Sequence, residues 1–508
     1  MNRHHAVVIG GSVAGLMAAQ VLSRHFGAVT VLDRDSLTDD GQPNEALPRK
    51  GVPQGQHVHV LLNSGLQALA QCFPGFLAEL QQDGVDRVAW SEEMRWFQHG
   101  SWKTRVPCGL DFYPQSRPAL EARIRARVRQ SPAVSLMGGC RVQGLLWAAG
   151  KAQVRGVRFE TGGQTHELLA DLVVDAGGRG SGMLGWLAAE GFAAPPKEAM
   201  AIDLVYVSRV YRQHAATGNP PRDWKGLAVH PLPDSPQGGI LLPLDAERWI
   251  VTLFGYAGAH PGSAPEDFLA FTRSLPVPDL FEALRDAEPL SAPVRYAYPQ
   301  QVWQRFDQLK QFPDGLLPLG DVVCSVDPVF GQGMTLACQQ AMALDRLLAV
   351  RPGSAAAQPL QRAYFRACKA LIAVPWLITQ AEALRFAATP GQRSLKIRCL
   401  QAYTGQVFAL SAQHVGVYRA FLDVMHLMAG PSALFRPAVL WRVLWRVLSR
   451  ALSGLRSGLL APLQRFRPSS PGAPPAPRSP SGPAPAHAAW SGKSAARPAT
   501  TPTARRGS

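Results

Sequence analysis

The sequence predicts an α/β protein with a Rossmann-like dinucleotide-binding domain, a second domain rich in β-strands, and a helical C-terminal region. Short apolar runs alternate with glycine turns and helical spacing over residues 1–190 and again over 310–350. Runs of β-branched and aromatic residues separated by Pro and Gly fill 191–309, and helical periodicity follows over 351–460. Residues 461–508 are rich in Pro, Ala, Ser and Arg without apolar spacing, so we expect a disordered tail.

Length and composition narrow the class further. A chain of 508 residues with 46% hydrophobic residues can form two or three domains. No window is apolar enough to predict a transmembrane helix. The apolar N-terminus has its glycines in a nucleotide-loop pattern rather than a signal-peptide pattern, so we expect a cytoplasmic protein.

The positive charge is concentrated at one end. No acidic residue follows Asp423, and twelve of the 52 basic residues lie at or beyond Arg436. The remainder has 40 basic against 36 acidic residues, so the formal charge of +16 belongs mainly to the tail and does not indicate a nucleic-acid-binding domain. The seven cysteines form no CxxC pair, which excludes a disulfide scaffold and a zinc ribbon.

The first motif follows the apolar run Ala6 to Ile9. It contains Gly10, Gly11, Ser12 and Gly15, and a helical pattern follows it. Such a turn presents free N–H groups at a helix N-terminus, where a pyrophosphate binds. The next predicted strand ends in Asp33, whose carboxylate can accept hydrogen bonds from adenosine ribose hydroxyls. Ser12 in place of a second glycine weakens the pattern, but the strand–turn–helix–strand–acid context favours a dinucleotide.

Two later motifs also place an acid at the end of an apolar run. Residues 171–181 run through Asp175 into a glycine turn, which is equally compatible with an ordinary strand-to-helix turn. Residues 316–334 contain Asp321 and then the Gly-rich segment PVFGQGM, although Pro318 is unfavourable in a central strand. An NAD-only dehydrogenase would leave this third motif without a role. FAD requires adenosine, pyrophosphate, ribityl and isoalloxazine sites, and the sequence offers candidates for all four.

These motifs occur in the order and approximate spacing of FAD-dependent monooxygenases of the para-hydroxybenzoate hydroxylase fold, which the sequence resembles over about 1–445. A narrower resemblance, to the squalene-epoxidase-like branch with the polyether epoxidases, lies in RKGVPQGQHVHVLL (49–62), SRPALE (116–121) and PVFGQGM (328–334). The family pattern implies a three-layer ββα FAD-binding domain over 1–190 and 310–350 and a substrate-binding β-sheet domain over 191–309. It implies cofactor contacts from Gly10, Gly11, Ser12, Gly15, Asp33, Arg34, Arg49, Arg117, Asp175, Gly177, Asp321, Pro328, Gly331, Gln332, Gly333 and Met334.

The resemblance also implies a reaction. NAD(P)H would reduce FAD, O2 would form a flavin C4a-hydroperoxide, and one oxygen atom would pass to a hydrophobic substrate by epoxidation or hydroxylation. It identifies no catalytic side chain, and the choice between NADH and NADPH, the substrate and the oligomeric state stay open. The alternatives are a flavin-dependent halogenase, a prenyl-chain reductase or dehydrogenase, and a membrane-associated flavin-binding scaffold. Against the halogenase, the Trp-x-Trp-x-Ile-Pro signature is absent and no lone catalytic lysine stands out.

Two histidines and a set of aromatic residues are further candidates for the site. His57 and His59 lie in a Gly/Pro loop without a third ligand cluster, so we predict a structural or cofactor-contact role and no metal. Aromatic residues of the strand-rich region are candidate substrate walls, with ordinary core packing the favoured interpretation for each; they are Tyr206, Tyr211, Trp224, Trp249 and Phe254.

The C-terminal helical pattern combines an apolar stripe with arginines. Trp441, Trp445, Leu448 and Leu452 recur at spacings of one helical turn, with Arg442 alongside them. Trp and Leu beside Arg are typical of a helix that lies on an anionic membrane, so contact through 436–465 is one prediction. A terminal helix packed on its own domain is slightly favoured, because Gly454 and Gly458 weaken a free-standing helix.

Overall fold

The computed structural model describes residues 4–37, 43–213, 222–350 and 359–464, with side chains described as far as Leu452. The chain divides into a unit Met1–Ser449 and a unit Arg450–Ser508, and the fold described here is that of the first. Residues 465–508, most of the predicted tail, lie outside the described residues.

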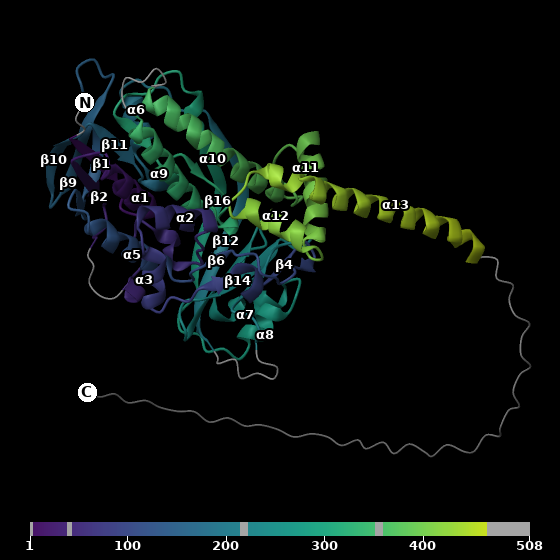
Figure 1. Cartoon of the computed structure of the whole chain (residues 1–508). Helices are drawn as coiled ribbons and strands as arrows, with labels where there is room; N and C mark the ends of the chain where they lie inside the picture. The colour runs from purple at the N-terminus through teal and green to yellow at the C-terminus, as the bar shows by residue number, and fades with distance from the viewer. Residues whose placement is uncertain (1–3, 38–42, 214–221, 351–358, 465–508) are drawn as a thin grey trace, which may run out of the picture. The chain divides into compact units, whose positions relative to one another are not determined.

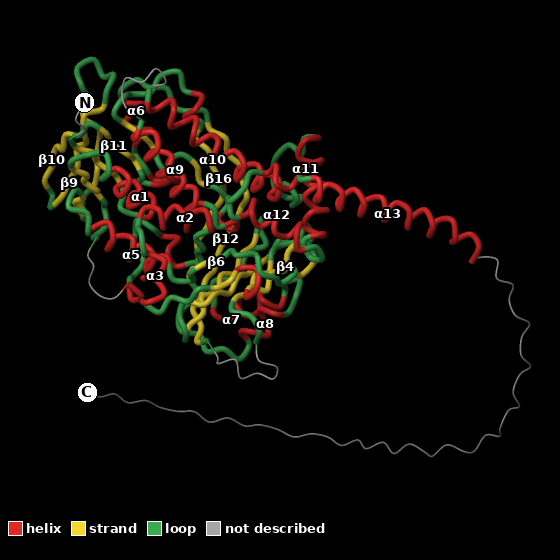
Figure 2. The backbone as a smooth tube through the Cα atoms, viewed as in Figure 1, coloured by secondary structure: helices red, strands yellow, loops and turns green. Residues whose placement is uncertain are grey.

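A five-stranded parallel sheet forms the centre of the nucleotide-binding part (Figures 1 and 2). Its strands, in spatial order, are β17 (Leu316–Pro318), β11 (Leu172–Asp175), β1 (His5–Ile9), β2 (Ala28–Leu32) and β7 (Val134–Met137). The central strands are continuous apolar runs because helices and a second sheet cover both faces. Strand β17 lies at the edge of the sheet and pairs there with β11. An edge strand needs hydrogen bonds on one side only, so the missing N–H group of Pro318 is tolerated.

The layers on either side complete the expected ββα arrangement. Helix α1 (Val13–Leu22) follows β1 and packs against α2 (Asn63–Cys72), α5 (Arg117–Arg129) and α9 (Gly333–Ala349). Strand β9 of an antiparallel sheet, formed by β8 (Arg141–Trp147), β9 (Val154–Thr161) and β10 (Gln164–Leu169), packs on β11 from the other side. Figure 1 shows these strands and α1 on opposite sides of the parallel strands. The predicted Rossmann-like three-layer fold is therefore confirmed.

An eight-stranded sheet forms the β-rich part. Its strands, in spatial order, are β18 (Cys324–Ser325), β16 (Val294–Gln304), β12 (Lys197–Arg212), β15 (Arg248–Gly255), β14 (Gln237–Pro243), β13 (Gly226–Val229), β4 (Met94–Gln98) and β5 (Ser101–Trp102). Strands β4 and β5 come from the range 1–190 and β18 from 310–350, so both ranges assigned to the nucleotide-binding domain also supply strands to this sheet. Helices α7 (Pro265–Arg273) and α8 (Asp279–Leu284) pack on it through a shared apolar cluster.

Helices follow the second nucleotide-binding segment, as predicted. They are α10 (Leu360–Ala383), α11 (Leu395–Leu410), α12 (Val415–Met425) and α13 (Pro437–Gln464). Residues of α11, α12 and the start of α13 share one apolar cluster with β4 and β13. Among the described residues no helix is both long and apolar enough to cross a membrane.

Candidate functional site

The turn after β1 has the close packing that a phosphate-binding loop needs. Gly10 has φ of +95°, and a Cβ there would lie 2.7 Å from the Ala176 carbonyl oxygen. A Cβ on Gly15 would lie 1.7 Å from the Gly10 carbonyl oxygen, so only glycine lets α1 start this close to β1. Ser12 occupies the N-cap of α1 without a side-chain capping bond, which leaves the first N–H groups of the helix for a ligand.

Asp33 stands at the carboxyl end of β2, next to that turn. Its Oδ2 accepts a hydrogen bond from Gly11 N at 2.6 Å, and its Oδ1 accepts one from Asp35 N at 2.8 Å. The acid therefore holds the glycine turn in place, and Oδ2 retains capacity for a further donor such as a ribose hydroxyl. Arg34, the next residue, is exposed.

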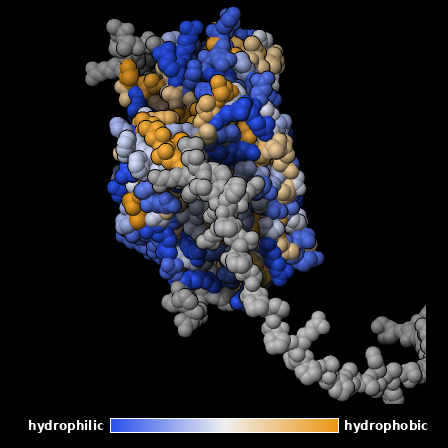
Figure 3. Space-filling model, turned by 90° about the vertical axis from the view of Figure 1, so that its right-hand side faces the viewer, coloured by the Kyte–Doolittle hydropathy of each residue, from blue (hydrophilic) through white to orange (hydrophobic). Residues whose placement is uncertain are grey.

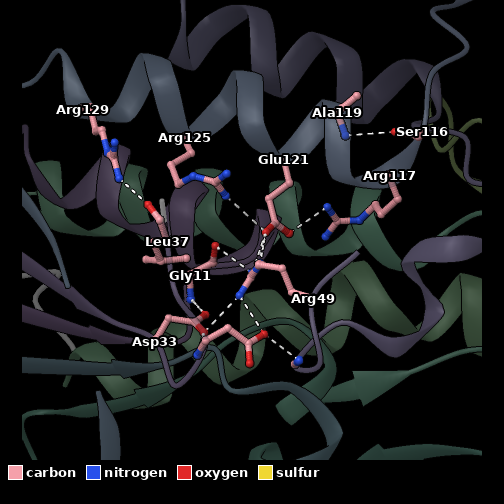
Figure 4. Close-up of polar contacts among 12 residues, drawn as sticks. Gly11, Asp33, Leu37, Arg49, Ser116, Arg117, Ala119, Glu121, Arg125 and Arg129 are labelled. Atoms are coloured by element: carbon pink, nitrogen blue, oxygen red, sulfur yellow. Dashed lines mark hydrogen bonds and ion pairs between the residues drawn. The ribbon is translucent and has the colours of Figure 1, made fainter. Parts of the chain in front are cut away.

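Arg49 joins three carboxylates beside this turn (Figure 4). Its Nη1 lies 3.1 Å from Asp33 Oδ1 and 3.1 Å from Asp35 Oδ2, while Nη2 lies 2.5 Å from Glu121 Oε1. Burial disfavours its charge, but Glu121, Asp33 and Asp35 outweigh that effect and raise the pKa of Arg49. Arg49 thus lies beside the glycine turn and Asp33, and its contact with a cofactor stays a prediction.

Helix α5 brings a second arginine to the same place. Ser116 caps the helix by accepting a hydrogen bond from Ala119 N at 3.1 Å, and Arg117 begins its first turn. Arg117 Nη1 donates to Glu121 Oε2 at 3.0 Å (Figure 4). Arg117 lines both a small cleft beside His59 and a second one that Arg49 also lines. Sequence reasoning missed Glu121, the buried acid that pairs with both arginines; its position one helical turn after Arg117 was the available signal.

Asp175 has a local structural role. Its carboxylate is fully buried, accepts a hydrogen bond from Gly177 N at 2.8 Å, and accepts another from the Ser181 hydroxyl. Burial raises its pKa to about 6, although both hydrogen bonds act in the opposite direction. The structure thus shows the strand-to-helix turn that the sequence left as an equal alternative. Contacts of Asp175 and Gly177 with a cofactor stay a prediction.

Asp321 differs from the other acids because its carboxylate accepts no hydrogen bond from any described residue. It follows β17 in a 3₁₀ turn, Gly320–Val322, and Gly320 N is held by Gln340 Oε1 at 2.8 Å. Burial raises the pKa of Asp321, while Arg179 and Arg117 lower it by their charge. A shielded carboxylate without a donor, at the C-terminal edge of a parallel sheet, is a ready acceptor for ligand hydroxyls.

The segment 327–334 leads from β18 into α9 and contains the remaining predicted contacts, Pro328, Gly331, Gln332, Gly333 and Met334. Gly331 has φ of +66°, and Gln332 is fully buried with neither its amide oxygen nor its amide nitrogen hydrogen-bonded among the described residues. Asp327 anchors the segment to the β-rich sheet: its Oδ2 accepts from Tyr256 OH at 2.8 Å, and its backbone N donates to Gln301 Oε1 at 3.2 Å. The glycine loop is therefore fixed against strands β15 and β16.

His57 starts a chain of hydrogen bonds that runs into strands β12 and β15 of the eight-stranded sheet. His57 Nδ1 lies 2.7 Å from Ser208 Oγ, Ser208 Oγ lies 2.6 Å from Thr252 Oγ1, and Thr252 Oγ1 accepts from Val58 N. Thr252 has no other acceptor among the described residues, so its hydroxyl donates to Ser208, which in turn donates to His57 Nδ1. The proton of the neutral ring is then on Nε2.

That Nε2–H group is buried and has no acceptor among the described residues. Burial lowers the pKa of His57 to about 4, so the ring is neutral at pH 7. The rings of Tyr206 and Tyr296 lie 5.8 and 5.6 Å from it. His59 instead turns its Nδ1 to the His57 carbonyl oxygen at 2.9 Å. In the described part of the chain no three His, Cys, Asp or Glu residues come together as a metal site.

The five aromatic residues considered as substrate walls fall into two clusters, because side chains alternate between the two faces of the sheet. Tyr206 and Phe254 share a cluster with Tyr256 and Tyr298, on the side where Ser208 meets His57. Tyr211, Trp224 and Trp249 belong to the cluster that packs against α7 and α8. Ser208 and Thr252 were not anticipated, although their period-two spacing from Tyr206 and Phe254 places them on the same face.

Several solved structures of flavin-dependent enzymes share this fold. The flavin-dependent brominase Bmp2 aligns over 88% of this chain and all of its own, with a TM-score of 0.60 and 14% identity. The p-nitrophenol 4-monooxygenase PnpA from Pseudomonas putida DLL-E4 aligns over 84% of this chain and 98% of its own, with a TM-score of 0.58 and 16% identity. The flavin-dependent halogenase CmlS gives a TM-score of 0.60 at 15% identity, over 84% of this chain and 77% of its own. The fold is therefore that of flavin-dependent monooxygenases and halogenases.

Sequence comparison identifies a family member. The chain belongs to the same family as Protein Rv3254 of Mycobacterium tuberculosis (strain ATCC 25618 / H37Rv), with 33% identity over 359 residues, which is 69% of this chain and 74% of that protein. No family model matches the sequence.

Proposed function

We propose that this protein is an FAD-dependent monooxygenase that uses NAD(P)H and O2 to epoxidise or hydroxylate a hydrophobic organic substrate. The observation that carries the proposal is Asp321, a half-buried carboxylate with no hydrogen-bond donor among the described residues, placed after the edge strand of a dinucleotide-type sheet. Such a group is unfavourable in a protein that has no ligand for it. The ribityl hydroxyls of FAD supply the missing donors.

The remaining segments fit the other parts of FAD. The Gly10–Gly15 turn and the N-terminus of α1 suit the pyrophosphate, and the free capacity of Asp33 Oδ2 suits the adenosine ribose. Arg49 and Arg117 line one cleft between these groups. The unpartnered amide of Gln332, in the glycine turn that opens α9, suits the polar edge of a flavin ring.

Bound FAD would supply the two-electron chemistry: NAD(P)H is oxidised, one atom of O2 enters the substrate, and the other leaves as water. The protein contributes orientation and exclusion of water. We assign His57 the role of a neutral hydrogen-bond donor toward the bound ligand, because its Nε2–H is buried without an acceptor. The tyrosines and Phe254 around it favour an apolar substrate bearing an oxygen acceptor.

The halogenase alternative is less well supported by this chain's residues. The structure contains one buried lysine that the sequence did not single out, Lys103, with a pKa lowered by burial to about 7. Its Nζ donates to the Phe408 carbonyl oxygen and to Ser411 Oγ, both at 2.9 Å. These bonds cap the C-terminal end of α11, so the Lys103 ammonium group has a structural role there.

The cofactor assignment is tested with Asp321→Ala and the exposed control Asp234→Ala. We expect Asp321→Ala to weaken FAD binding by about tenfold or more, the equivalent of one hydrogen bond to a charged acceptor. The apo protein should be as stable as the wild type or more stable, because the variant removes a carboxylate that has no hydrogen-bond donor and whose charge partial burial disfavours. Fluorescence titration and thermal denaturation provide the two readouts. Equal FAD affinity in the wild type and both variants would overturn the assignment.

The reaction class is tested on the FAD-loaded protein. We expect NADH or NADPH to bleach the flavin anaerobically, and added O2 to restore the oxidised spectrum and oxygenate an alkene or phenol substrate. Reduction by NAD(P)H without oxygenated product from any such substrate would favour the reductase or dehydrogenase. Product halogenated in the presence of bromide would favour the halogenase, and no reduction would favour the scaffold.

A further inference from the structure

The start of helix α13 has two apolar faces, and only one is covered. Val439 and Val443 are 3% and 8% exposed and belong to the cluster formed with α11 and α12. The other face, which we call the Trp–Leu face, stays between 42% and 64% exposed; it comprises Leu440, Trp441, Leu444, Trp445, Val447 and Leu448. All these residues belong to the first unit of the chain. Figure 3 views this side of the molecule, where hydrophobic residues gather in its upper half.

The polar side of the same helix bears one sign of charge. Arg442 and Arg446 lie away from the Trp–Leu face, on the side of the helix that also carries the covered Val439 and Val443. No acidic residue follows Asp423 in the whole sequence. Arg446 is held by Gln406 Oε1 at 3.2 Å, and Arg442 reaches back to the Ala438 carbonyl oxygen at 2.9 Å. The two tryptophans lie together, with ring centroids 6.4 Å apart. Adjacent Trp rings and a basic polar face are features of helices that lie in a lipid interface.

Other occupants of this face fit less well. Residues 465–508 contain only two large apolar side chains, Phe466 and Trp490, and their charge has the same sign as that of the helix. A second copy would bring up a helix with the same positive charge and no acidic residue, so the two helices would repel each other. An anionic bilayer suits both the apolar face and the positive charge of the helix, because it offers an apolar layer beneath a layer of phosphates.

We propose that the Trp–Leu face of α13 docks this protein on the surface of an anionic phospholipid membrane. Trp441 and Trp445 enter the boundary between headgroups and acyl chains, and the arginines of the helix remain near the lipid phosphates. This is attachment at the surface, since no described helix is suited to crossing a bilayer. The inference is independent of the proposed redox function.

Vesicle co-sedimentation of the full chain tests this proposal. One set of vesicles is phosphatidylcholine alone, and the other has one lipid in three replaced by phosphatidylglycerol. The test variant is Trp441→Ser/Trp445→Ser. Its matched control, Leu169→Ser/Leu290→Ser, removes two exposed apolar side chains outside α13. We expect the wild type and the control to prefer the anionic vesicles, and the tryptophan variant to bind them about tenfold or more weakly.

A second variant separates charge from apolar insertion. Arg442→Gln/Arg450→Gln should weaken binding to the anionic vesicles and leave the weak binding to phosphatidylcholine unchanged. Failure of the wild type to bind anionic vesicles would overturn the proposal. So would equal binding by the tryptophan variant, which would assign attachment to the basic tail alone. A dimer in light scattering that dissociates in the tryptophan variant would also overturn it, in favour of a second copy.

Discussion

Three polar groups lie where the nucleotide-binding segments meet the β-rich sheet, and none has a hydrogen-bond partner among the described residues. They are the buried Gln332 amide, the buried His57 Nε2 and the half-buried Asp321 carboxylate. A buried polar group without a partner carries the penalty of an unmade hydrogen bond, which a ligand can relieve. The Asp175 carboxylate, in contrast to that of Asp321, is paired locally. This contrast separates the acids that the sequence treated alike.

The tautomer of His57 is a direct consequence of the hydroxyl chain. We expect long-range ¹⁵N–¹H NMR to show a neutral ring with its proton on Nε2 at pH 7, and still neutral near pH 5, because burial lowers the pKa to about 4. Ser208→Ala removes the donor to Nδ1 and should allow both tautomers. His57→Gln assigns the signal. An Nδ1–H signal in the wild type would contradict the assigned direction of the chain.

His426 predicts a pH dependence of stability. Its Nδ1 accepts hydrogen bonds from Asn63 Nδ2 at 3.0 Å and Asn63 N at 3.4 Å, and burial lowers its pKa to about 3. His426 therefore takes up a proton near pH 6.5 in the unfolded chain but stays neutral in the folded chain down to about pH 3. The free energy of unfolding is consequently highest above pH 6.5 and falls as the pH drops toward 3.

His426→Asn keeps an acceptor but cannot titrate. Between pH 6 and pH 4.5 its free energy of unfolding should fall less steeply than that of the wild type, by about 1.4 kcal/mol per pH unit. Urea denaturation at both pH values measures the slope. The exposed His166→Asn is the control and should retain the wild-type slope. Identical slopes in all three proteins would refute the prediction.

At the scale of elements, the glycine-rich segment 327–334 is held by hydrogen bonds from tyrosines of the eight-stranded sheet and the turn after β15. Tyr256 donates to Asp327, and Tyr298 donates to the Val326 carbonyl oxygen at 3.0 Å. Burial raises the pKa of Asp327 to about 6, and the hydrogen bond from Tyr256 opposes that rise.

Removing the two hydroxyls separately should have unequal effects. Tyr256→Phe leaves a buried carboxylate short of a donor and should lower the free energy of unfolding by about 1–3 kcal/mol. Tyr298→Phe leaves a neutral carbonyl without that donor and should lower it by about 1 kcal/mol or less. Urea denaturation at pH 7 compares them. A larger loss in Tyr298→Phe would contradict the assigned role of Asp327.

The sequence predicted those elements whose cause is local. The strand, glycine turn and helix at residues 6–22 follow from the apolar spacing and from glycines at positions where a Cβ atom would clash with the backbone. Pro318 was unfavourable for a central strand, and the structure places it in an edge strand, because edge position depends on the whole sheet order. The chain from His57 through Ser208 to Thr252 joins residues up to 195 positions apart, and no local pattern encodes it.

At the scale of the whole molecule, the sequence ranges of the nucleotide-binding part also supply strands to the β-rich sheet. The segment Met94–Trp102 pairs with β13 although it lies between nucleotide-binding elements in the sequence. The sequence predicted the fold class and the order of its segments. It could not place β4 and β5, because strands paired across 130 positions leave no local signal of their partner.

The boundary at Ser449 predicts how the C-terminus tolerates deletion. A chain ending at Ser449 keeps Val439 and Val443 in their cluster and should denature within a few degrees of the full chain. A chain ending at Phe435 loses both buried valines and should be less stable by roughly 2–5 kcal/mol. Thermal and urea denaturation compare the three lengths. Equal stability of the two shortened chains would show that the start of α13 adds nothing to the fold.

The central claim is that three separate segments together hold an adenine dinucleotide with a flavin ring. The most direct measurement is a fluorescence titration of the flavin-free full chain with FAD, FMN and riboflavin. We predict one FAD per chain, bound at least about a hundredfold more tightly than FMN or riboflavin, because we expect the Gly10–Gly15 turn, Asp33 and Arg49 to contact only the ADP half. Equal affinity for FMN, or no binding of FAD, would contradict the account.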